Sequence, residues 1–201
     1  MIRHKIIRGV RISRYVMYRE TLVDHKEHFW AFLGSFIGIG TIAYLQSNLL
    51  SVNDNLFLIG SFGASSVLVY GVIQSPLAQP RNLIGGHLIC ALIGVTIAKL
   101  LPDIVWITAP LAVSLSIVLM QITKTLHPPG GATALIAVIG SEKIKGMGYL
   151  YVLSPVLTGC LILLFVALIF NNITSNRSYP TRSGYTRRIR KRIIGLSGGD
   201  K

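Results

Sequence analysis

The residue with the clearest chemical potential is His127, which begins the run His127-Pro128-Pro129-Gly130-Gly131-Ala132-Thr133 between two long apolar segments. An imidazole has an unperturbed pKa of about 6.5 and so exchanges a proton close to neutral pH. His127 could therefore be a proton-coupling site or a donor to an anion. It could also be a residue at a helix break that hydrogen-bonds free backbone groups. His87 has the same interpretations on a more regular helix.

The prolines and glycines after His127 predict an interruption of regular structure. Neither proline carries an N–H, and the residue before a proline is pushed out of the helical region. Gly130 and Gly131 then allow close backbone approach. Residues 132–139 are apolar again and predict a short helix. Such backbone is tolerated at membrane depth only where it is buried in protein or lines a wet cavity, so these residues are expected to shape a site.

Four apolar segments are long enough to cross a membrane, for which about 20 residues are needed. The predicted spans are residues 29–45, 83–101, 104–122 and 149–170. Two shorter segments, residues 56–73 and 124–140, are interrupted by small residues or prolines. The expected fold class is an all-α polytopic membrane protein with four full spans and two half-helices.

The composition also indicates a membrane protein. The chain is 51% hydrophobic and only 13% charged, with a mean hydropathy of +0.59, whereas a soluble domain carries roughly 25% charged residues. The net charge is +13, but Lys and Arg crowd both ends of the chain. This placement follows the positive-inside rule, so both termini are expected in the cytoplasm. We expect a bacterial inner membrane and no nucleic acid partner.

Three regions are predicted along the chain. Residues 1–27 predict a basic interfacial helix, with an organellar transit peptide as the alternative. Residues 28–172 form the transmembrane domain. Residues 173–201 predict a basic cytoplasmic tail that lies on anionic lipid. Within the first span, Gly34 and Gly38 permit tight helix contact and make a homo-oligomer plausible.

A weak internal repeat is visible in the transmembrane domain. Residues 63–69, Gly-Ala-Ser-Ser-Val-Leu-Val, resemble residues 131–137, Gly-Ala-Thr-Ala-Leu-Ile-Ala. Each copy lies between two predicted spans, so the unit is span, broken segment, span, over residues 28–101 and 104–172. The alternative is that small-residue apolar runs recur by chance in membrane chains.

The interrupted segments suggest how an anion could be held. A helix over residues 63–73 covers about 16 Å, roughly half the hydrocarbon core, and residues 56–62, if extended, cover the rest. If both segments cross, there are six crossings in an inverted repeat, and helices begin at mid-membrane near Gly63 and Gly130. Their N-termini would favour an anion, and hydroxyl donors could come from Ser61, Ser65, Ser66 and Thr133. If both segments return, there are four spans and the repeats are parallel.

Three motifs, in the same order, resemble blocks of the HPP family of integral membrane proteins. They are His127-Pro128-Pro129-Gly130-Gly131-Ala132-Thr133, Gly60-Ser61-Phe62-Gly63-Ala64-Ser65, and Ser75-Pro76-Leu77-Ala78-Gln79-Pro80-Arg81-Asn82 followed by Gly85-Gly86-His87. The resemblance covers roughly residues 28–172. It implies four membrane spans and, from plastid and cyanobacterial members, transport of nitrite, although many bacterial members have no assigned activity.

Other polar residues have weaker claims to a role. Arg81 could attract anions to the mouth of the site or could be an interfacial anchor, while Gln79 and Asn82 could be gate donors or turn residues. His25 and His28 have a spacing that could hold a metal, but without further ligands they predict a solvated helix start. We expect no catalytic residue, metal or cofactor.

The function expected from the sequence is transport or channelling of a small monovalent anion, with nitrite implied by the resemblance. The partners expected are that anion, the lipid bilayer, anionic lipid at the basic termini and a second copy of the chain. The alternative is a non-transporting membrane assembly or regulatory protein, and a membrane-embedded enzyme ranks third. The candidate substrate site comprises His127, Pro128, Pro129, Gly130, Gly131, Thr133, Ser61, Gly63, Ser65, Ser66, His87 and Arg81.

Overall fold

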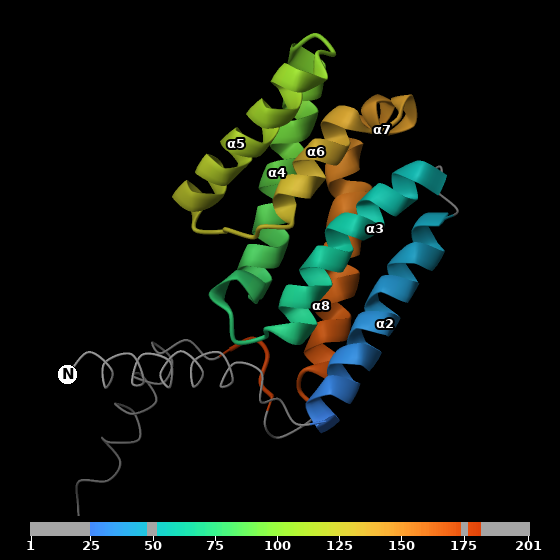
Figure 1. The fold of residues 1–201 in the computed structure, drawn as a ribbon, viewed down its shortest axis with the longest axis vertical. Helices are drawn as coiled ribbons and strands as arrows, with labels where there is room; N and C mark the ends of the chain where they lie inside the picture. The colour runs from blue at the N-terminus through green and yellow to red at the C-terminus, as the bar shows by residue number, and fades with distance from the viewer. Residues whose placement is uncertain (1–24, 48–51, 174–176, 182–201) are drawn as a thin grey trace, which may run out of the picture.

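The computed structural model describes residues 25–47, 52–173 and 177–181, and the secondary structure of these residues is helical throughout (Figure 1). The predicted all-α class is therefore confirmed for the described chain. The basic segment 1–27 and the tail 173–201 lie almost entirely outside the described residues. The elements are α2 (His25–Ser47), α3 (Val52–Ser66), η1 (Val67–Gly71), η2 (Pro76–Ala78), α4 (Pro80–Leu100), α5 (Val105–Thr123), α6 (Gly130–Ile139), α7 (Glu142–Met147), η3 (Val152–Leu157) and α8 (Thr158–Phe170).

Four helices are long and apolar enough to cross a membrane: α2, α4, α5 and the continuous pair η3–α8. They correspond to the four predicted spans. The last one bends at Ser154, which has non-helical backbone angles immediately before Pro155. A proline inside a helix frees a carbonyl and kinks the axis. The carbonyl freed in this way belongs to the residue four positions before the proline. Beside the same bend, the buried amide of Gln46 on α2 donates to the carbonyl of Pro155 itself, at 3.3 Å.

Contacts define two ends of the bundle. We call one the terminal end, because the first and last described helices meet there: the rings of Trp30, at the start of α2, and Phe170, at the end of α8, lie 6.2 Å apart. The end of η1 is there too, because the Asn171 amide donates to the carbonyl of Val69 at 2.8 Å. At the opposite, far end, the backbone N–H of Ser141 donates to Asp54 at the start of α3, at 3.1 Å.

The first interrupted segment is not broken where the sequence predicted. Residues 56–62 were expected to be extended, with a helix starting at Gly63, but α3 is helical from Val52 and continues through η1 to Gly71. These 15 and 5 residues run for about 30 Å at 1.5 Å per residue. The small residues do not stop the helix, since no proline occurs before Pro76. The break falls instead in the loop 72–79.

The second interrupted segment behaves as predicted. Helix α5 ends at Lys124, which adopts a left-handed conformation with φ of 57°, a common way to end a helix. The chain then passes through Pro128 and Pro129 without helix, and α6 begins at Gly130. The carbonyl of Pro129 lies 3.1 Å from the hydroxyl of Ser61, near the middle of α3. Helix α6 is therefore a half-length helix that starts inside the bundle and ends at the far end.

Along the chain, successive segments run in alternating directions: α2, α3–η1, α4, α5, α6 and η3–α8 (Figure 1). Helix α2 packs on α3 and α8, and α5 packs on α6 and α4. In an inverted repeat, each helix of one half has an equivalent in the other half with matching neighbours. However, the segment that should be equivalent is unbroken in α3 and broken before α6, so the repeat stays a prediction.

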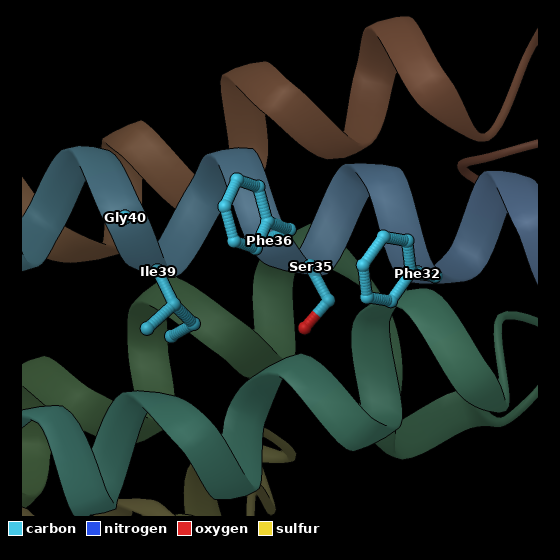
Figure 2. Close-up of a pocket in the computed structure, with 5 residues that line it drawn as sticks. All are labelled: Phe32, Ser35, Phe36, Ile39 and Gly40. Carbon is cyan, nitrogen blue, oxygen red and sulfur yellow. The ribbon is translucent and has the colours of Figure 1, made fainter.

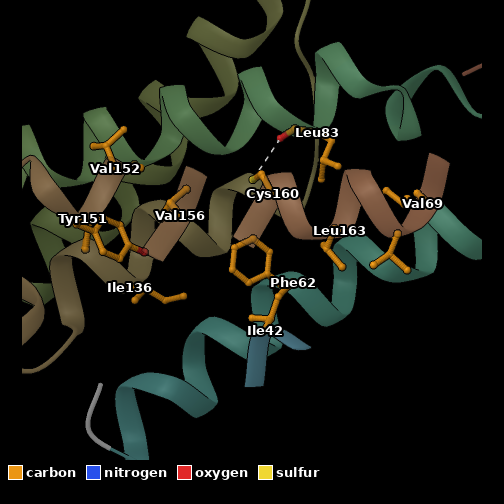
Figure 3. Close-up of a cluster of buried hydrophobic side chains, with 14 of the residues drawn as sticks. Ile42, Phe62, Val69, Leu83, Ile136, Tyr151, Val152, Val156, Cys160 and Leu163 are labelled. Carbon is orange, nitrogen blue, oxygen red and sulfur yellow. Dashed lines mark hydrogen bonds between the residues drawn. The ribbon is translucent and has the colours of Figure 1, made fainter. Parts of the chain in front are cut away.

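A buried apolar cluster ties the first and last helices together (Figure 3). It includes Ile42 on α2, Phe62 on α3, Leu83 on α4 and Leu163 on α8. In α2, Gly34 and Gly38 face this cluster: a Cβ at Gly38 would lie 2.6 Å from the hydroxyl oxygen of Tyr70. The tight contact expected of these glycines is thus made within the chain, and this face is not free for self-association.

Candidate functional site

Five polar side chains meet at the place where α3, α4, α6 and the loop before α6 come together. They form the polar cluster, each member at most 2% exposed: Ser61, Ser65, His87, His127 and Thr133. The cluster lies beside the middle of α3, where Ser61 contacts the start of α6. Polar and ionisable groups at this depth are costly and are rarely retained without a function.

Ser65 joins the two histidines. Its hydroxyl oxygen lies 2.8 Å from Nε2 of His87 and 3.0 Å from Nε2 of His127. The centroids of the two rings are 5.0 Å apart. Helix α3 brings Ser65 between the histidines because Ser61 and Ser65 are one turn apart and share one face of the helix. The predicted hydroxyl donors of this segment are therefore positioned by an unbroken helix.

Thr133 extends the same network on the other side of His87. Its hydroxyl oxygen is 2.7 Å from Nδ1 of His87 and 2.9 Å from the hydroxyl oxygen of Ser61. Ser61 also lies within hydrogen-bonding distance of the Pro129 carbonyl, at 3.1 Å. Tyr151 donates to the backbone carbonyl of Thr133 at 3.1 Å and so fixes this part of α6 from the side of η3.

The contact of His127 with the loop 72–79 assigns the proton positions in the network. Its Nδ1 lies 2.9 Å from the carbonyl oxygen of Leu77, which can only accept, so Nδ1 carries the proton. Neutral His127 then accepts at Nε2 from the Ser65 hydroxyl. The Ser65 oxygen accepts in turn from Nε2–H of His87. Nδ1 of His87 then accepts from the Thr133 hydroxyl, and the Thr133 oxygen accepts from the Ser61 hydroxyl. Both histidines are fully hydrogen-bonded while uncharged.

Close packing of α4 on α6 brings the histidines together. A Cβ at Gly86 would lie 2.5 Å from Cβ of His127 and 2.9 Å from the carbonyl oxygen of Thr125. A Cβ at Gly130 would lie 2.9 Å from Sγ of Cys90 and 3.0 Å from the carbonyl oxygen of Gly86. Because only glycine leaves this space, the two backbones approach directly beside His87.

The cluster contains no formal charge when the histidines are neutral. Its hydrogen bonds all go to hydroxyls, imidazoles and backbone carbonyls of described residues. Among the residues with described burial, the buried ones with a formal charge are Asp54 and Arg177. They lie at opposite ends of the bundle, where Asp54 binds Ser141 and Arg177 binds the carbonyl of Tyr70.

The predicted pair of helix starts facing an anion is wrong in this structure. Gly63 lies inside α3, so no helix begins there. At the start of α6, the N–H groups of Gly130, Gly131 and Ala132 donate to the carbonyls of the residues three positions earlier, at 2.9–3.1 Å. These donors are already used within the chain. Any anion-binding capacity must therefore come from hydroxyl and imidazole groups.

The other predicted site residues lie outside the cluster. Pro128 is exposed, and a Cβ added at Gly63 would meet nothing within 4 Å. Ser66 is buried, and its hydroxyl has no hydrogen-bond partner in the network. Arg81 is exposed at the terminal end and donates to the carbonyl of Thr123 at 2.7 Å, as an anchor would. A Cβ added at Gly131 would meet only Val113, at 3.9 Å.

Gln79 lies at the end of the loop 72–79, and Asn82 lies in the first turn of α4. The Gln79 amide donates to the carbonyls of Ile73 and Ser75, at 3.0 and 2.8 Å. Asn82 donates to the carbonyl of Leu126 at 2.8 Å. The Gln79 bonds fix the loop 72–79 against itself, and the Asn82 bond fixes the start of α4 against the residue before His127. Both side chains thus hold the backbone that surrounds the cluster.

Two surface hollows lie away from the polar cluster. One, of about 420 Å³, is lined along α2 by Phe32, Ser35, Phe36, Ile39 and Gly40 (Figure 2). The other, of about 310 Å³, lies at the far end and includes Asp103, Glu142 and Lys145. Lys145 pairs with Asp103 there at 2.6 Å. Neither hollow is lined by a member of the cluster.

Sequence reasoning missed two parts of the site. Tyr151 stands near the start of a span, where aromatic residues are ordinary interfacial anchors, so its bond to the Thr133 carbonyl had no local signal. The carbonyl of Leu77 belongs to the backbone and is brought to His127 only by the packing of two loops. For Leu77, the family-like block over residues 75–82 was the one available indication.

Comparisons with known proteins agree that the chain is a membrane protein. Residues 20–180 match the family described as HPP, transmembrane region. Two proteins of Dictyostelium discoideum, each called a transmembrane protein, are 46% identical over 165 residues and 45% identical over 160 residues. The alignments cover 81% and 78% of this chain but 58% and 51% of the relatives, so the chain spans about half the length of these relatives. No solved structure matches. The chain belongs to the HPP family of integral membrane proteins.

Proposed function

We propose that this protein carries a small monovalent anion, such as nitrite, across the membrane by way of the polar cluster. The observation that carries the proposal is the meeting of His87, His127, Ser65 and Thr133, all buried, at the break before α6. In membrane transporters, substrate sites lie near the midplane beside broken helices. The resemblance to the HPP family supplies the choice of nitrite.

The donor chemistry of the cluster suits a small anion. Hydroxyl and imidazole N–H groups donate hydrogen bonds, and no described carboxylate contacts these side chains to repel a negative charge. To reach the cluster, the anion must replace bonds that the side chains now make to one another. The structure therefore supports a closed arrangement, in which the site opens only when α6 or the loop 72–79 moves.

Uptake by purified full-length protein in proteoliposomes tests the proposal. Nitrite, nitrate, formate and chloride are each offered outside, and the amount inside is compared with that in empty vesicles. We expect at least one of these anions, nitrite first, to enter faster with the protein present. Equal rates for all four anions with and without protein would reject transport.

A second function is favoured by the completeness of the network. A polar core whose hydrogen bonds are all made internally is also what a purely structural element requires. In this case the protein would be a non-transporting assembly or regulatory partner that acts through its basic ends. Deleting residues 175–201 would then abolish the cellular phenotype while replacement of His127 would not, and the reverse result would favour transport.

We also propose a bacterial inner membrane with both termini in the cytoplasm. The start of α2 and the end of α8 lie at the same end of the bundle, and Lys and Arg are concentrated in the segments beyond them. Cytoplasmic loops carry the excess of such residues. Anionic lipid at the basic ends, and self-association through a surface other than Gly34 and Gly38, are part of the same proposal. No enzymatic reaction is proposed.

A further inference from the structure

We propose that the polar cluster takes up one proton, at Nδ1 of His87, with each anion that it carries, so that transport is proton-coupled. This inference rests on the proposed anion transport and adds a second transported species. It follows from the polarity of the hydrogen bonds and from two carbonyl oxygens that the neutral network leaves free to accept more.

When both histidines are neutral, each of the three hydroxyl groups donates its proton to one member of the cluster. Ser61 donates to Thr133, Thr133 donates to Nδ1 of His87, and Ser65 donates to Nε2 of His127. A hydroxyl has one proton to give. The carbonyl of Pro129, 3.1 Å from the Ser61 hydroxyl, already accepts from the N–H of Ala132 but has a second lone pair with which it can accept again. The carbonyl of Ser61, 3.2 Å from the Ser65 hydroxyl, is a second acceptor within reach.

One added proton fits this arrangement without moving a heavy atom. On the side where the anion enters, one O–H bond of a hydronium ion breaks, its proton binds to the lone pair of Nδ1 of His87, and a water molecule is left behind. The hydrogen bond from the Thr133 hydroxyl to this lone pair is given up at the same time. The new N–H donates to the Thr133 oxygen at 2.7 Å. The Thr133 hydroxyl turns to Ser61, at 2.9 Å, and the Ser61 hydroxyl turns to the Pro129 carbonyl. Every nitrogen and hydroxyl of the cluster then still has a partner.

His127 can share the proton. The Ser65 hydroxyl bridges Nε2 of both rings. It can pass its own proton to His127 while it accepts one from His87, so the charge shifts between the rings. In the other direction, Nδ1 of His127 points at Leu77 in the loop 72–79. This loop lies at the terminal end, where Tyr179 donates to the carbonyl of Ala78.

An anion in this cluster needs such a proton. Burying a lone charge in the membrane interior is costly unless an opposite charge accompanies it. The titratable groups that face the cluster from neighbouring elements are neutral ones: Tyr151 before η3, Cys90 on α4 and Cys160 on α8. The buried charges of Asp54 and Arg177 are at the two ends of the bundle. Imidazolium is the cation that the described site can supply.

The test uses full-length protein in vesicles whose membrane potential is clamped at zero by valinomycin with equal potassium on both sides. Nitrite is added outside at pH 7.5 or 6.5, with a lumen at pH 7.5 that holds a pH-sensitive dye. We expect nitrite uptake to rise at least threefold when the outside is acidic, and the lumen to acidify in step with uptake. Rates from empty vesicles are subtracted, because undissociated nitrous acid crosses lipid unaided.

Two variants test the role of His87. Gln at position 87 keeps one donor and one acceptor but cannot take up a proton, so H87Q should lose the response to external pH and lower lumen acidification at least tenfold. S61A removes the relay to the Pro129 carbonyl and should weaken acidification in the same direction. H28Q is the matched control, because His28 is exposed at the start of α2 and should behave as the wild type. Monodispersity and helicity in detergent confirm folding.

The outcomes separate the two proposals. Nitrite uptake that follows an imposed membrane potential, with no lumen acidification, would overturn proton coupling and leave anion transport standing. Wild-type acidification in both folded H87Q and S61A would also overturn it. No uptake of nitrite, nitrate, formate or chloride would overturn anion transport and proton coupling together.

Discussion

At the scale of single residues, Ser65 is the member of the cluster on which the others depend. One hydroxyl serves both histidines, at 2.8 and 3.0 Å, from a position on α3 that is completely buried. Both Nε2 atoms would lose their partner at once if this oxygen were removed. The orientation of His127 has a second support in the Leu77 carbonyl, and that of His87 has one in Thr133. Among the described residues, Ser65 is the one whose side chain hydrogen-bonds both rings.

Replacement of Ser65 by alanine should therefore destabilise the protein as well as impair transport. A single hydrogen bond between membrane helices is worth about 0.6 kcal/mol on average, but a buried polar group left without a partner costs about 1–3 kcal/mol. We expect S65A to lower the free energy of unfolding in mixed micelles by about 1–3 kcal/mol. S114A, at an exposed serine on α5, should change it little. A stability equal to wild type in S65A would contradict the assigned bridge.

At the scale of elements, the contact of α4 with α6 positions the site. Gly86 and Gly130 let the helices meet where a Cβ would collide with backbone or with His127. Close packing explains three of the four glycines in the Gly-Gly pairs, because a Cβ at Gly85 would also lie 2.7 Å from the Thr125 side chain, whereas one at Gly131 would meet only Val113, at 3.9 Å. Helix α3 then lies across the pair and contributes Ser61 and Ser65 from one face.

Two glycine-to-alanine changes test two different features: the close packing at Gly86 and the continuity of helix α3 at Gly63. G86A places a Cβ 2.5 Å from that of His127, and overpacking of this kind costs about 1–3 kcal/mol. G63A adds a Cβ in open space inside α3, where alanine is better than glycine by about 0.5–1 kcal/mol. Unfolding in mixed micelles should show a loss for G86A and no loss for G63A. If G63A were as damaging as G86A, α3 would not be a continuous helix at that position.

At the scale of the whole molecule, the terminal end is held by a short segment after α8. The guanidinium of Arg177 donates to the carbonyls of Glu27 and Tyr70, at 3.1 and 2.6 Å, and to the side-chain oxygen of Asn171, at 2.8 Å. Burial lowers the pKa of Arg177 from its ordinary value, while Glu27 opposes the shift. These bonds join the start of α2, the end of η1 and the end of α8.

The alternating directions of α2, α3–η1, α4, α5, α6 and η3–α8 predict six membrane crossings. Gln74 and Lys143 are exposed and lie at the terminal and far ends, respectively. Cysteines introduced at these two positions should react with a membrane-impermeant thiol reagent from opposite sides of sealed vesicles. The native Cys90 and Cys160 are buried, so we expect little reaction of these two residues with the reagent. Reaction of both new cysteines from the same side would contradict six crossings and indicate that the interrupted segments return.

The sequence by itself determined the properties that depend on local chemistry. Apolar length predicted the four spans, and Pro128 and Pro129 predicted the break before α6, because a missing N–H interrupts a helix whatever surrounds it. Three motifs indicated the HPP family, and five of the residues singled out as a site do meet.

Only the tertiary structure decided how these parts are used. Glycine and serine permit either a helix or a break, so packing settled that α3 runs through Gly63. Hydrogen-bond partners come from distant segments, which is why the sequence could not show that the first N–H groups of α6 are already bonded or that Leu77 fixes the proton of His127. The same holds for Gly38, whose partner Tyr70 belongs to another helix.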